Sequence, residues 1–444
     1  MKKGLAKVVS LLVLGGVLLS GCGTNTTAST TAAGASDSSG ESTGAATQAT
    51  AAAGDTVTLN VFNPQPRFEE QYAAYLDQFC VYYEEQTGVK VEYNLEMPTA
   101  DTAPQILKTR LTTGDAPDVF TVHAINEKQD YFNAGYLEDL SGEAWVDTLY
   151  DSAKAAVTEN GGKVVCLPLE SLTWGYLYNK DIYTELGLKV PMTLDEMNSN
   201  IAAIEAAGYT PFLSAYAESW IPQLFLPLTV GAYVKTTNTD FVTKMSGDAG
   251  SFSEISGMFD IIDLVNAHTN EDALDFGNDN GCVEFATGNY AMWVQGPWDS
   301  ESILTADPEF NLGVAPLPVS NDASQTVINN SVSTSWAVSS TSEHKDVAKA
   351  MIAYFLNADT SNDFFQSVQF NPLSTVHTFE PYPWIAEATT YVEAGKSVLD
   401  PSIPQAVKDE SGIILQAYWQ GTATKEQVMS DLDTTWKTYN ATNK

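Results

Sequence analysis

Strand and helix patterns alternate regularly in the first folded part of the chain. Alternating apolar residues predict a strand over 56–62, and apolar residues at helical spacing predict a helix over 68–87. Further strands are predicted over 89–93 and 118–122, with a helix over 103–113 between them. This order predicts a doubly wound α/β lobe with a parallel sheet core.

The length and charge of the chain set its class. With 444 residues it exceeds one ordinary domain, so two lobes plus terminal extensions are expected. The composition is globular, and no internal repeat is visible. A formal net charge of −35 excludes a broad surface for nucleic acid or for an anionic membrane.

The amino terminus has the pattern of a secretion signal. Three lysines precede the apolar run 8–19, which is too short to span a bilayer comfortably. Residues 19–22, ending in Cys22, resemble a bacterial lipobox, so residues 1–21 are predicted to be a lipoprotein signal peptide. Lipid on Cys22 would then anchor the protein to the outer face of the cell membrane. The alternative is an ordinary secreted protein with a coincidental cysteine.

Residues 22–54 are predicted to form a tether that begins at the lipidated Cys22. From residue 23 onward this segment is rich in Thr, Ala, Ser and Gly and has no aromatic residue, so it cannot bury a core. As a flexible coil it would reach about 30 Å. The folded part is expected to start near Asp55.

Three further cysteines, Cys80, Cys166 and Cys282, lie far apart in the sequence and beside apolar residues. They have no metal-ligand spacing, so they are expected to be buried thiols with at most one disulfide among them. The four histidines form no ligand pattern either. No metal and no cofactor are expected.

The stretch 285–298 is the most informative one for function. Gly288 can end a helix, residues 290–294 are suited to a buried strand, and Gly296-Pro297 forces the chain out of that strand. Trp298 is therefore expected at the strand end, where its flat apolar face and N–H suit a sugar ring. The alternative is that Trp298 simply fills a core beside the turn.

Stretch 285–298, followed by residues 311–318, closely resembles the family of extracellular solute-binding proteins that serve sugar ABC importers, which includes the maltose-binding proteins. Segments 87–91, 111–119 and 167–196 also resemble motifs of this family, and the ordered similarity spans nearly all of 55–439. In the family, the tryptophan of the Gly-Pro-Trp turn stacks on the bound sugar.

The resemblance implies an α/β fold of the periplasmic-binding-protein type, with two discontinuous lobes joined by a hinge of three chain crossings. An N-lobe of residues 55–170 plus 333–373 and a C-lobe of residues 171–332 plus 374–444 are expected. The segment 327–338 is expected to be the return strand into the first lobe.

Candidate ligand-binding residues come from two sources. Ligands of open α/β sheets bind beyond the carboxyl ends of the strands, which selects Asn63, Gln65, Arg67, His123 and Asn126. The resemblance adds positions in the second lobe and at the crossings: Glu218, Trp220, Glu170, Trp174 and Trp336.

Each candidate has a structural alternative. The aromatic residues and Glu170 could simply pack, Glu218 could be a helix-start acid, and His123 could be a structural histidine. Val122 and Ile125 stand where maltose-binding proteins carry a tryptophan and an aspartate, which argues against maltose itself. Asp409 and Glu410 are weaker candidates.

The expected function is carbohydrate binding outside the cell, with delivery to an ABC transporter permease and no catalysis. The chain has no HExxH, G-x-S-x-G or P-loop motif. A surface glycoside hydrolase using Glu170 and Glu218, or an adhesin lipoprotein, are the alternatives. A monomer is expected, and the residues do not define which sugar is bound.

Overall fold

The structure is a computed structural model that describes residues 52–159, 161–378 and 382–443. The chain divides into the units Met1–Gln48 and Ala49–Lys444, and the fold described below belongs to the second unit. The predicted signal peptide, Cys22 and most of the predicted tether lie outside the described residues. The last tether residues are described: Gly54 N donates to Gly88 O at 2.8 Å, so the described fold starts slightly before Asp55.

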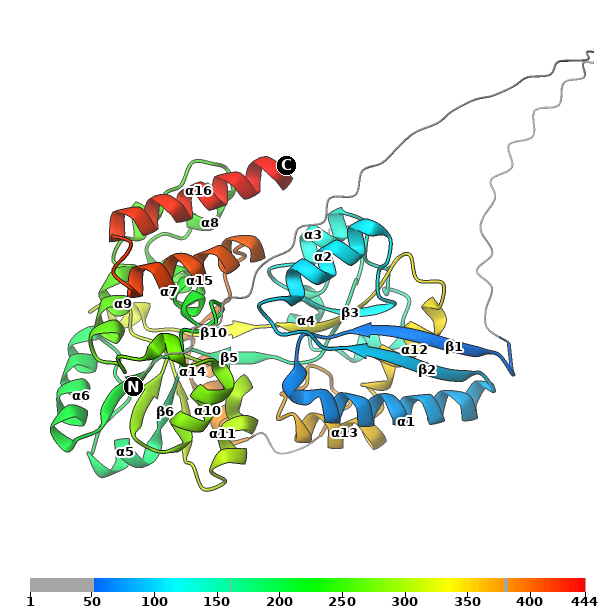
Figure 1. The fold of residues 1–444 in the computed structure, drawn as a ribbon, viewed down its shortest axis with the longest axis horizontal. Helices are drawn as coiled ribbons and strands as arrows, with labels where there is room; N and C mark the ends of the chain where they lie inside the picture. The colour runs from blue at the N-terminus through cyan, green and yellow to red at the C-terminus, as the bar shows by residue number, and fades with distance from the viewer. Residues whose placement is uncertain (1–51, 160, 379–381, 444) are drawn as a thin grey trace, which may run out of the picture. The chain divides into compact units, whose positions relative to one another are not determined.

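The first lobe is built on a five-stranded sheet in the order β2-β1-β3-β11-β4 (Figure 1). Its strands are β1 (Thr56–Phe62), β2 (Lys90–Glu96), β3 (Val119–His123), β4 (Leu167–Pro168) and β11 (Thr334–Val338). The predicted parallel core is present as β2-β1-β3, whereas β11 runs antiparallel to both β3 and β4. The sheet is therefore mixed.

Helices connect and flank these strands, and their ends follow ordinary capping chemistry. Gly88 ends the first long helix with φ of 72°, and its N–H bonds to Glu84 O, as expected for a left-handed glycine cap. The first-lobe helices are η1 (Pro66–Phe68), α1 (Glu69–Thr87), α2 (Ala103–Thr113), α3 (Lys128–Asn133), η2 (Ala144–Thr148), α4 (Asp151–Ala156), α12 (Lys345–Tyr354) and α13 (Ala358–Ser367).

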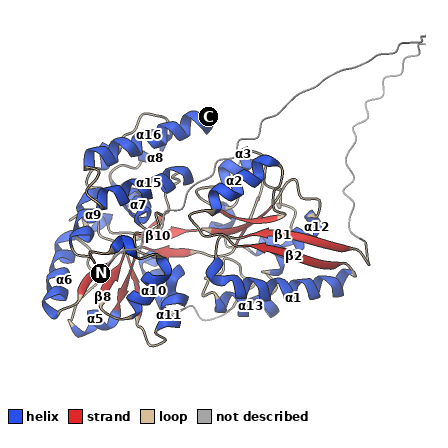
Figure 2. Cartoon of the chain, viewed as in Figure 1, coloured by secondary structure: helices blue, strands red, loops and turns tan. Residues whose placement is uncertain are grey.

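The second lobe has a four-stranded mixed sheet in the order β7-β8-β6-β9, surrounded by helices (Figure 2). The strands are β6 (Tyr176–Asn179), β7 (Thr210–Leu213), β8 (Tyr290–Trp293) and β9 (Leu312–Ala315). The helices are α5 (Lys180–Glu185), α6 (Leu194–Ala207), η3 (Pro222–Leu224), α7 (Phe225–Thr236), α8 (Phe241–Ser246), η4 (Phe252–Ile255), α9 (Met258–Ala267), η5 (Ala273–Asp275), α10 (Asn278–Ala286), η6 (Pro297–Asp299), α11 (Ser300–Ala306), η7 (Ala323–Gln325), α14 (Pro383–Glu393), α15 (Gln405–Trp419) and α16 (Lys425–Asn443).

A third sheet, of order β12-β10-β5, carries the chain between the lobes. Its strands are β5 (Leu172–Trp174), β10 (Ile328–Ser331) and β12 (Ser397–Leu399). The chain runs β4-β5-β6 in one direction and β9-β10-β11 in the other, and β5 pairs antiparallel with β10. A third segment passes beside them, where Ser171 N donates to Asn371 O at 2.9 Å.

The prediction that 327–338 is one return strand is wrong in one respect, because this segment forms two strands that belong to different sheets. β10 belongs to the hinge sheet and β11 to the first-lobe sheet. The break falls between Ser331 and Thr334. The sequence of this segment does not reveal where the chain leaves one sheet and joins another.

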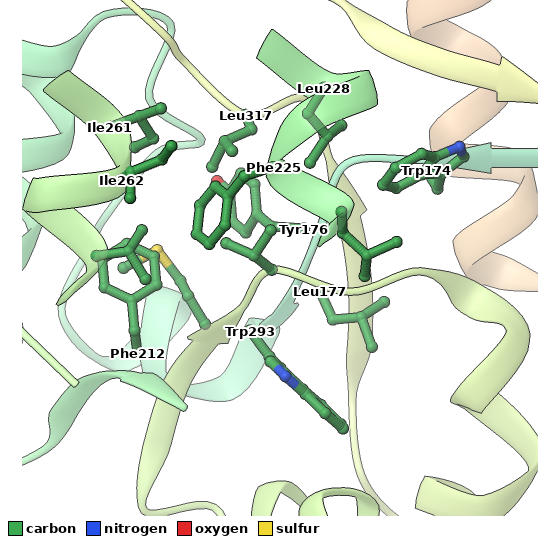
Figure 3. Packing of buried hydrophobic residues seen from close by; sticks show 14 of the residues in the cluster. Trp174, Tyr176, Leu177, Phe212, Phe225, Leu228, Ile261, Ile262, Trp293 and Leu317 are labelled. Atoms are coloured by element: carbon green, nitrogen blue, oxygen red, sulfur yellow. The ribbon is translucent and has the colours of Figure 1, made fainter. Parts of the chain in front are cut away.

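The buried apolar residues form two separate clusters. One contains residues between Val57 and Leu169 together with Val332 to Leu373. The other contains residues between Leu172 and Ile328 together with Trp384 to Trp436 (Figure 3). Each lobe therefore has its own core, and each core is assembled from segments that are distant in sequence.

Within the described part of the chain, no helix is long and apolar enough to cross a membrane.

Candidate functional site

A pocket of about 360 Å³, counted with its open mouth, lies where the hinge segments meet the second lobe. Its wall includes Glu170, which lies two residues before β5, and Trp298 of η6. These two residues were both predicted to bind ligand, and they come from different parts of the sequence. The pocket therefore brings together two of the predicted site residues.

Trp298 is held at the end of β8 by a tight turn, as its sequence predicts. A Cβ atom at Gly296 would lie 2.1 Å from the Trp298 ring, so only glycine allows this close approach. Trp174 packs against Trp298 with ring centroids 5.4 Å apart and planes at 60°. Trp298 remains partly exposed, whereas Trp174 is 3% exposed and mainly supports its neighbour.

Glu170 is buried and belongs to a chain of hydrogen bonds. Thr334 Oγ1 donates to Glu170 Oε1 at 2.7 Å, and Gln65 Nε2 donates to Thr334 Oγ1 at 3.3 Å. Tyr72 OH in turn donates to Gln65 Oε1 at 2.8 Å. Burial raises the pKa of Glu170 to about 7, although the Thr334 hydroxyl and the Arg67 charge act in the opposite direction.

Glu170→Gln is expected to change how stability depends on pH. The pKa of about 7 in the folded protein lies above the ordinary value of 4.5, so the folded state binds this proton more tightly than the unfolded state does. The stability that the protonated Glu170 carboxyl contributes is fully present below about pH 4.5 and is lost as the pH rises to about 7. The variant should therefore gain stability relative to wild type over this interval, as measured by denaturant unfolding at several pH values.

The comparison with wild type is needed because buried histidines act in the opposite direction. Burial lowers the pKa of His377 to about 4 and that of His123 well below its usual value. Because the folded protein holds these histidines neutral, acidification lowers the stability of wild type and variant alike. Parallel stability curves for the two proteins would contradict the burial account of Glu170.

Arg67 forms an ion pair across the two lobes. Its Nη1 lies 3.5 Å from Asp299 Oδ1, and Asp299 is fully buried next to Trp298 in the sequence. Asn278 Nδ2 donates to the same Asp299 oxygen at 2.9 Å, and Gln295 Nε2 donates to Asn278 Oδ1 at 3.0 Å. Burial raises the pKa of Asp299 to about 6, with Arg67 opposing the shift. Sequence reasoning missed Asp299, although it directly follows the motif tryptophan.

Glu218 and Trp220 hold the start of helix α10. Glu218 Oε1 accepts from Asn278 N at 2.8 Å, and Trp220 Nε1 donates to Glu218 Oε2 at 2.7 Å. This geometry matches the alternative of an acid at a helix start beside a packed tryptophan. Both side chains are partly exposed, so their contact with a sugar stays a prediction. The glycosidase pair gains no support, because both oxygens of Glu218 are engaged.

His123 and Asn126 join a second polar cluster, which also connects the lobes. With its amide oxygen turned toward the donors, Asn126 accepts from Lys408 Nζ at 3.0 Å and from His123 Nε2 at 3.3 Å. Lys408 is buried, which lowers its pKa, while Asp400, Asp409 and Glu127 act in the opposite direction. The cluster is an interlobe contact, and its part in ligand binding stays a prediction.

The remaining candidates do not gather at the pocket wall. Trp336 is fully buried in the first-lobe core, where it stacks on Phe355 at 6.0 Å and 16°. Asn63 is also fully buried. Asp409 accepts from Gln405 Nε2 at 2.7 Å, and Glu410 is exposed. The geometry favours the packing alternative for Trp336.

The three described cysteines are free thiols. Cys166 and Cys282 are buried as predicted, whereas Cys80 is only half-buried. Burial raises the pKa of Cys80 to about 11, which disfavours the reactive thiolate. In the part of the chain that the structure describes, no group of three or more His, Cys, Asp or Glu side chains could hold a metal ion.

Comparison with known proteins identifies a family. The model of the bacterial extracellular solute-binding proteins matches residues 65–361. A multiple sugar-binding protein of Streptococcus mutans is 25% identical over 329 residues, which cover 72% of this chain and 75% of the relative.

Solved structures share the fold. A sugar transporter protein of Bacillus licheniformis, in complex with stachyose, has a TM-score of 0.74 at 20% identity and covers 85% of this chain and 98% of its own. The solute-binding protein RafE, in complex with raffinose, has a TM-score of 0.69 at 23% identity, and the match covers 86% of this chain and 100% of the RafE chain. The predicted α/β fold of the periplasmic-binding-protein type is confirmed.

Proposed function

The chain belongs to the family of bacterial extracellular solute-binding proteins, and we propose that it is the carbohydrate-binding component of an ABC import system. Members of this family bind solutes and do not catalyse reactions. The protein would capture a mono- or oligosaccharide between its lobes and deliver it to a membrane permease. Similarity to proteins described as multiple sugar-binding, and as complexes with stachyose and raffinose, supports a carbohydrate ligand.

The observation that carries this proposal is the shared pocket of Glu170 and Trp298. Trp298 offers a flat apolar face for the C–H side of a sugar ring, and Glu170 offers an acceptor for its hydroxyls. This combination of an aromatic wall with a few fixed polar groups is typical of small-molecule sites. We place the sugar in this pocket, with Glu218 and Trp220 as further candidate contacts.

The lobe boundaries follow from the same proposal. We assign 55–170 plus 333–373 to the N-lobe and 171–332 plus 374–444 to the C-lobe. The separation of the two buried clusters between Leu169 and Leu172, and again between Ile328 and Val332, supports these boundaries.

Calorimetric titration of the mature protein with raffinose, stachyose and a chitin oligosaccharide tests the function. We expect saturable binding of at least one of these sugars, which is then recovered chemically unchanged. Failure of all three to bind, or turnover of a bound sugar, would contradict the proposal.

We also propose that lipid on Cys22 anchors the protein to the outer face of the cell membrane. The lipobox-like residues 19–22 support this anchor. Such an anchor keeps the binding protein near its permease, and residues 23–54 would serve as the tether.

A further inference from the structure

The lining of the pocket also contains residues that the sequence did not suggest. Trp384 comes from α14, and Gln369 lies just after α13. Trp384 is 6% exposed, and its ring stacks on Tyr382 with centroids 4.9 Å apart and planes at 8°. The Trp384 indole is therefore fixed in place by packing.

Four residues of the pocket lining carry buried polar atoms without a hydrogen-bond partner among the described residues. Glu170 Oε2, Gln369 Oε1, Trp298 Nε1 and Trp384 Nε1 are buried and have no hydrogen-bond partner within the described part of the chain. All four residues line the same pocket. A buried polar group without a partner is unfavourable, so native proteins usually satisfy such groups.

Unpaired indole N–H groups alone are not diagnostic. Trp145, Trp293, Trp336 and Trp436 also have one, and these residues are buried in the two hydrophobic cores away from the pocket lining. What distinguishes the pocket is that its lining residues include two with an unpaired acceptor and two with an unpaired donor. A sugar hydroxyl both donates and accepts a hydrogen bond, so a ring with several hydroxyls can satisfy this mixed set.

Gln369 has a second unusual feature. Its φ is 57°, and among the described non-glycine residues only Asp248 shares a positive φ. This residue ends α13: Gln369 N donates to Gln366 O at 3.2 Å and Phe370 N donates to Phe365 O at 3.0 Å, which is the pattern of a Schellman cap. The cap fixes the backbone of Gln369, which is one of the residues lining the pocket.

Resting on the proposed function, we propose that Trp384 and Gln369 are specificity-determining residues that bind hydroxyls of the carbohydrate, together with Glu170 and Trp298. Trp384 supplies a donor and Gln369 an acceptor.

Two variants remove single polar atoms with little loss of bulk. Trp384→Phe retains an aromatic ring and removes the N–H, and Gln369→Met retains the length and removes the amide oxygen. Trp436→Phe is the matched control, because it removes an equally unpaired indole N–H in a core remote from the pocket lining. Affinity for the tightest binder among raffinose, stachyose and the chitin oligosaccharide is measured by calorimetry, and melting temperature is recorded in parallel.

Each pocket variant is expected to weaken binding about 3- to 10-fold, which corresponds to one neutral hydrogen bond. The control should bind like wild type, even if its melting temperature falls equally. If both pocket variants bind with unchanged affinity while Trp298→Ala binds weakly, the inference about Trp384 and Gln369 is wrong and the proposed function still stands. If the wild type binds none of the three sugars, the proposed function fails and this inference fails with it.

Discussion

Trp298→Ala is expected to weaken carbohydrate binding about 30-fold or more. The substitution removes the stacking face at the pocket wall, and we expect a loss of about 2–4 kcal/mol by analogy with aromatic interface hot spots. Since 1.4 kcal/mol corresponds to tenfold in affinity, this loss is well within reach of calorimetry. The fold should survive, because Trp298 is partly exposed at the edge of the second-lobe core.

The matched control is Trp293→Ala, only five positions earlier in the sequence. Trp293 is 1% exposed in the core of the second lobe (Figure 3), so its truncation should cost about 3–5 kcal/mol of stability. Melting temperature without ligand separates the two roles. If Trp298→Ala binds sugar normally but melts as early as Trp293→Ala, then Trp298 is a core residue.

Cys22→Ser is expected to move the protein from the membrane fraction to the medium. Each buried CH₂ of an acyl chain contributes about 0.8 kcal/mol, so two chains hold a protein stably and their loss releases it. Cell fractionation followed by immunoblotting measures the change.

Cys80→Ser is the control for the anchor, because Cys80 is a half-buried thiol outside the lipobox-like residues. This variant should stay with the membrane. Retention of Cys22→Ser in the membrane fraction would show that another feature anchors the protein.

Local sequence patterns predicted the regular elements well. The helix 103–113 matches α2 to the residue, and the strand 56–62 matches β1. Gly288 has φ of 75°, consistent with the predicted end of the preceding helix. These features depend on short-range periodicity and backbone preferences, which a single sequence contains.

Features that depend on distant contacts were harder to predict. Nothing in the sequence near Trp384 or Gln369 indicates that they meet Glu170, which lies about two hundred residues earlier. Asp299 was missed because its role comes from Arg67, a residue of the other lobe. Trp336 was offered as a cleft residue because it is close to a hinge crossing, yet β11 directs it into the first-lobe core. Side-chain direction in a strand reverses at every residue, so proximity to the hinge alone could not place Trp336.

The proposed capture of sugar between the lobes also predicts a change in conformation. The ion pair of Arg67 and Asp299 and the hydrogen bond between Asn126 and Lys408 join the two lobes. Ligand bound between the lobes should favour the arrangement in which these contacts form. Binding energy would then be coupled to hinge closure.

Small-angle X-ray scattering of the mature protein, with and without its tightest-binding sugar, tests this central claim most directly. We predict a smaller radius of gyration at saturating sugar, because the lobes close around the ligand. An unchanged radius at a sugar concentration that calorimetry shows to be saturating would contradict capture between two hinged lobes.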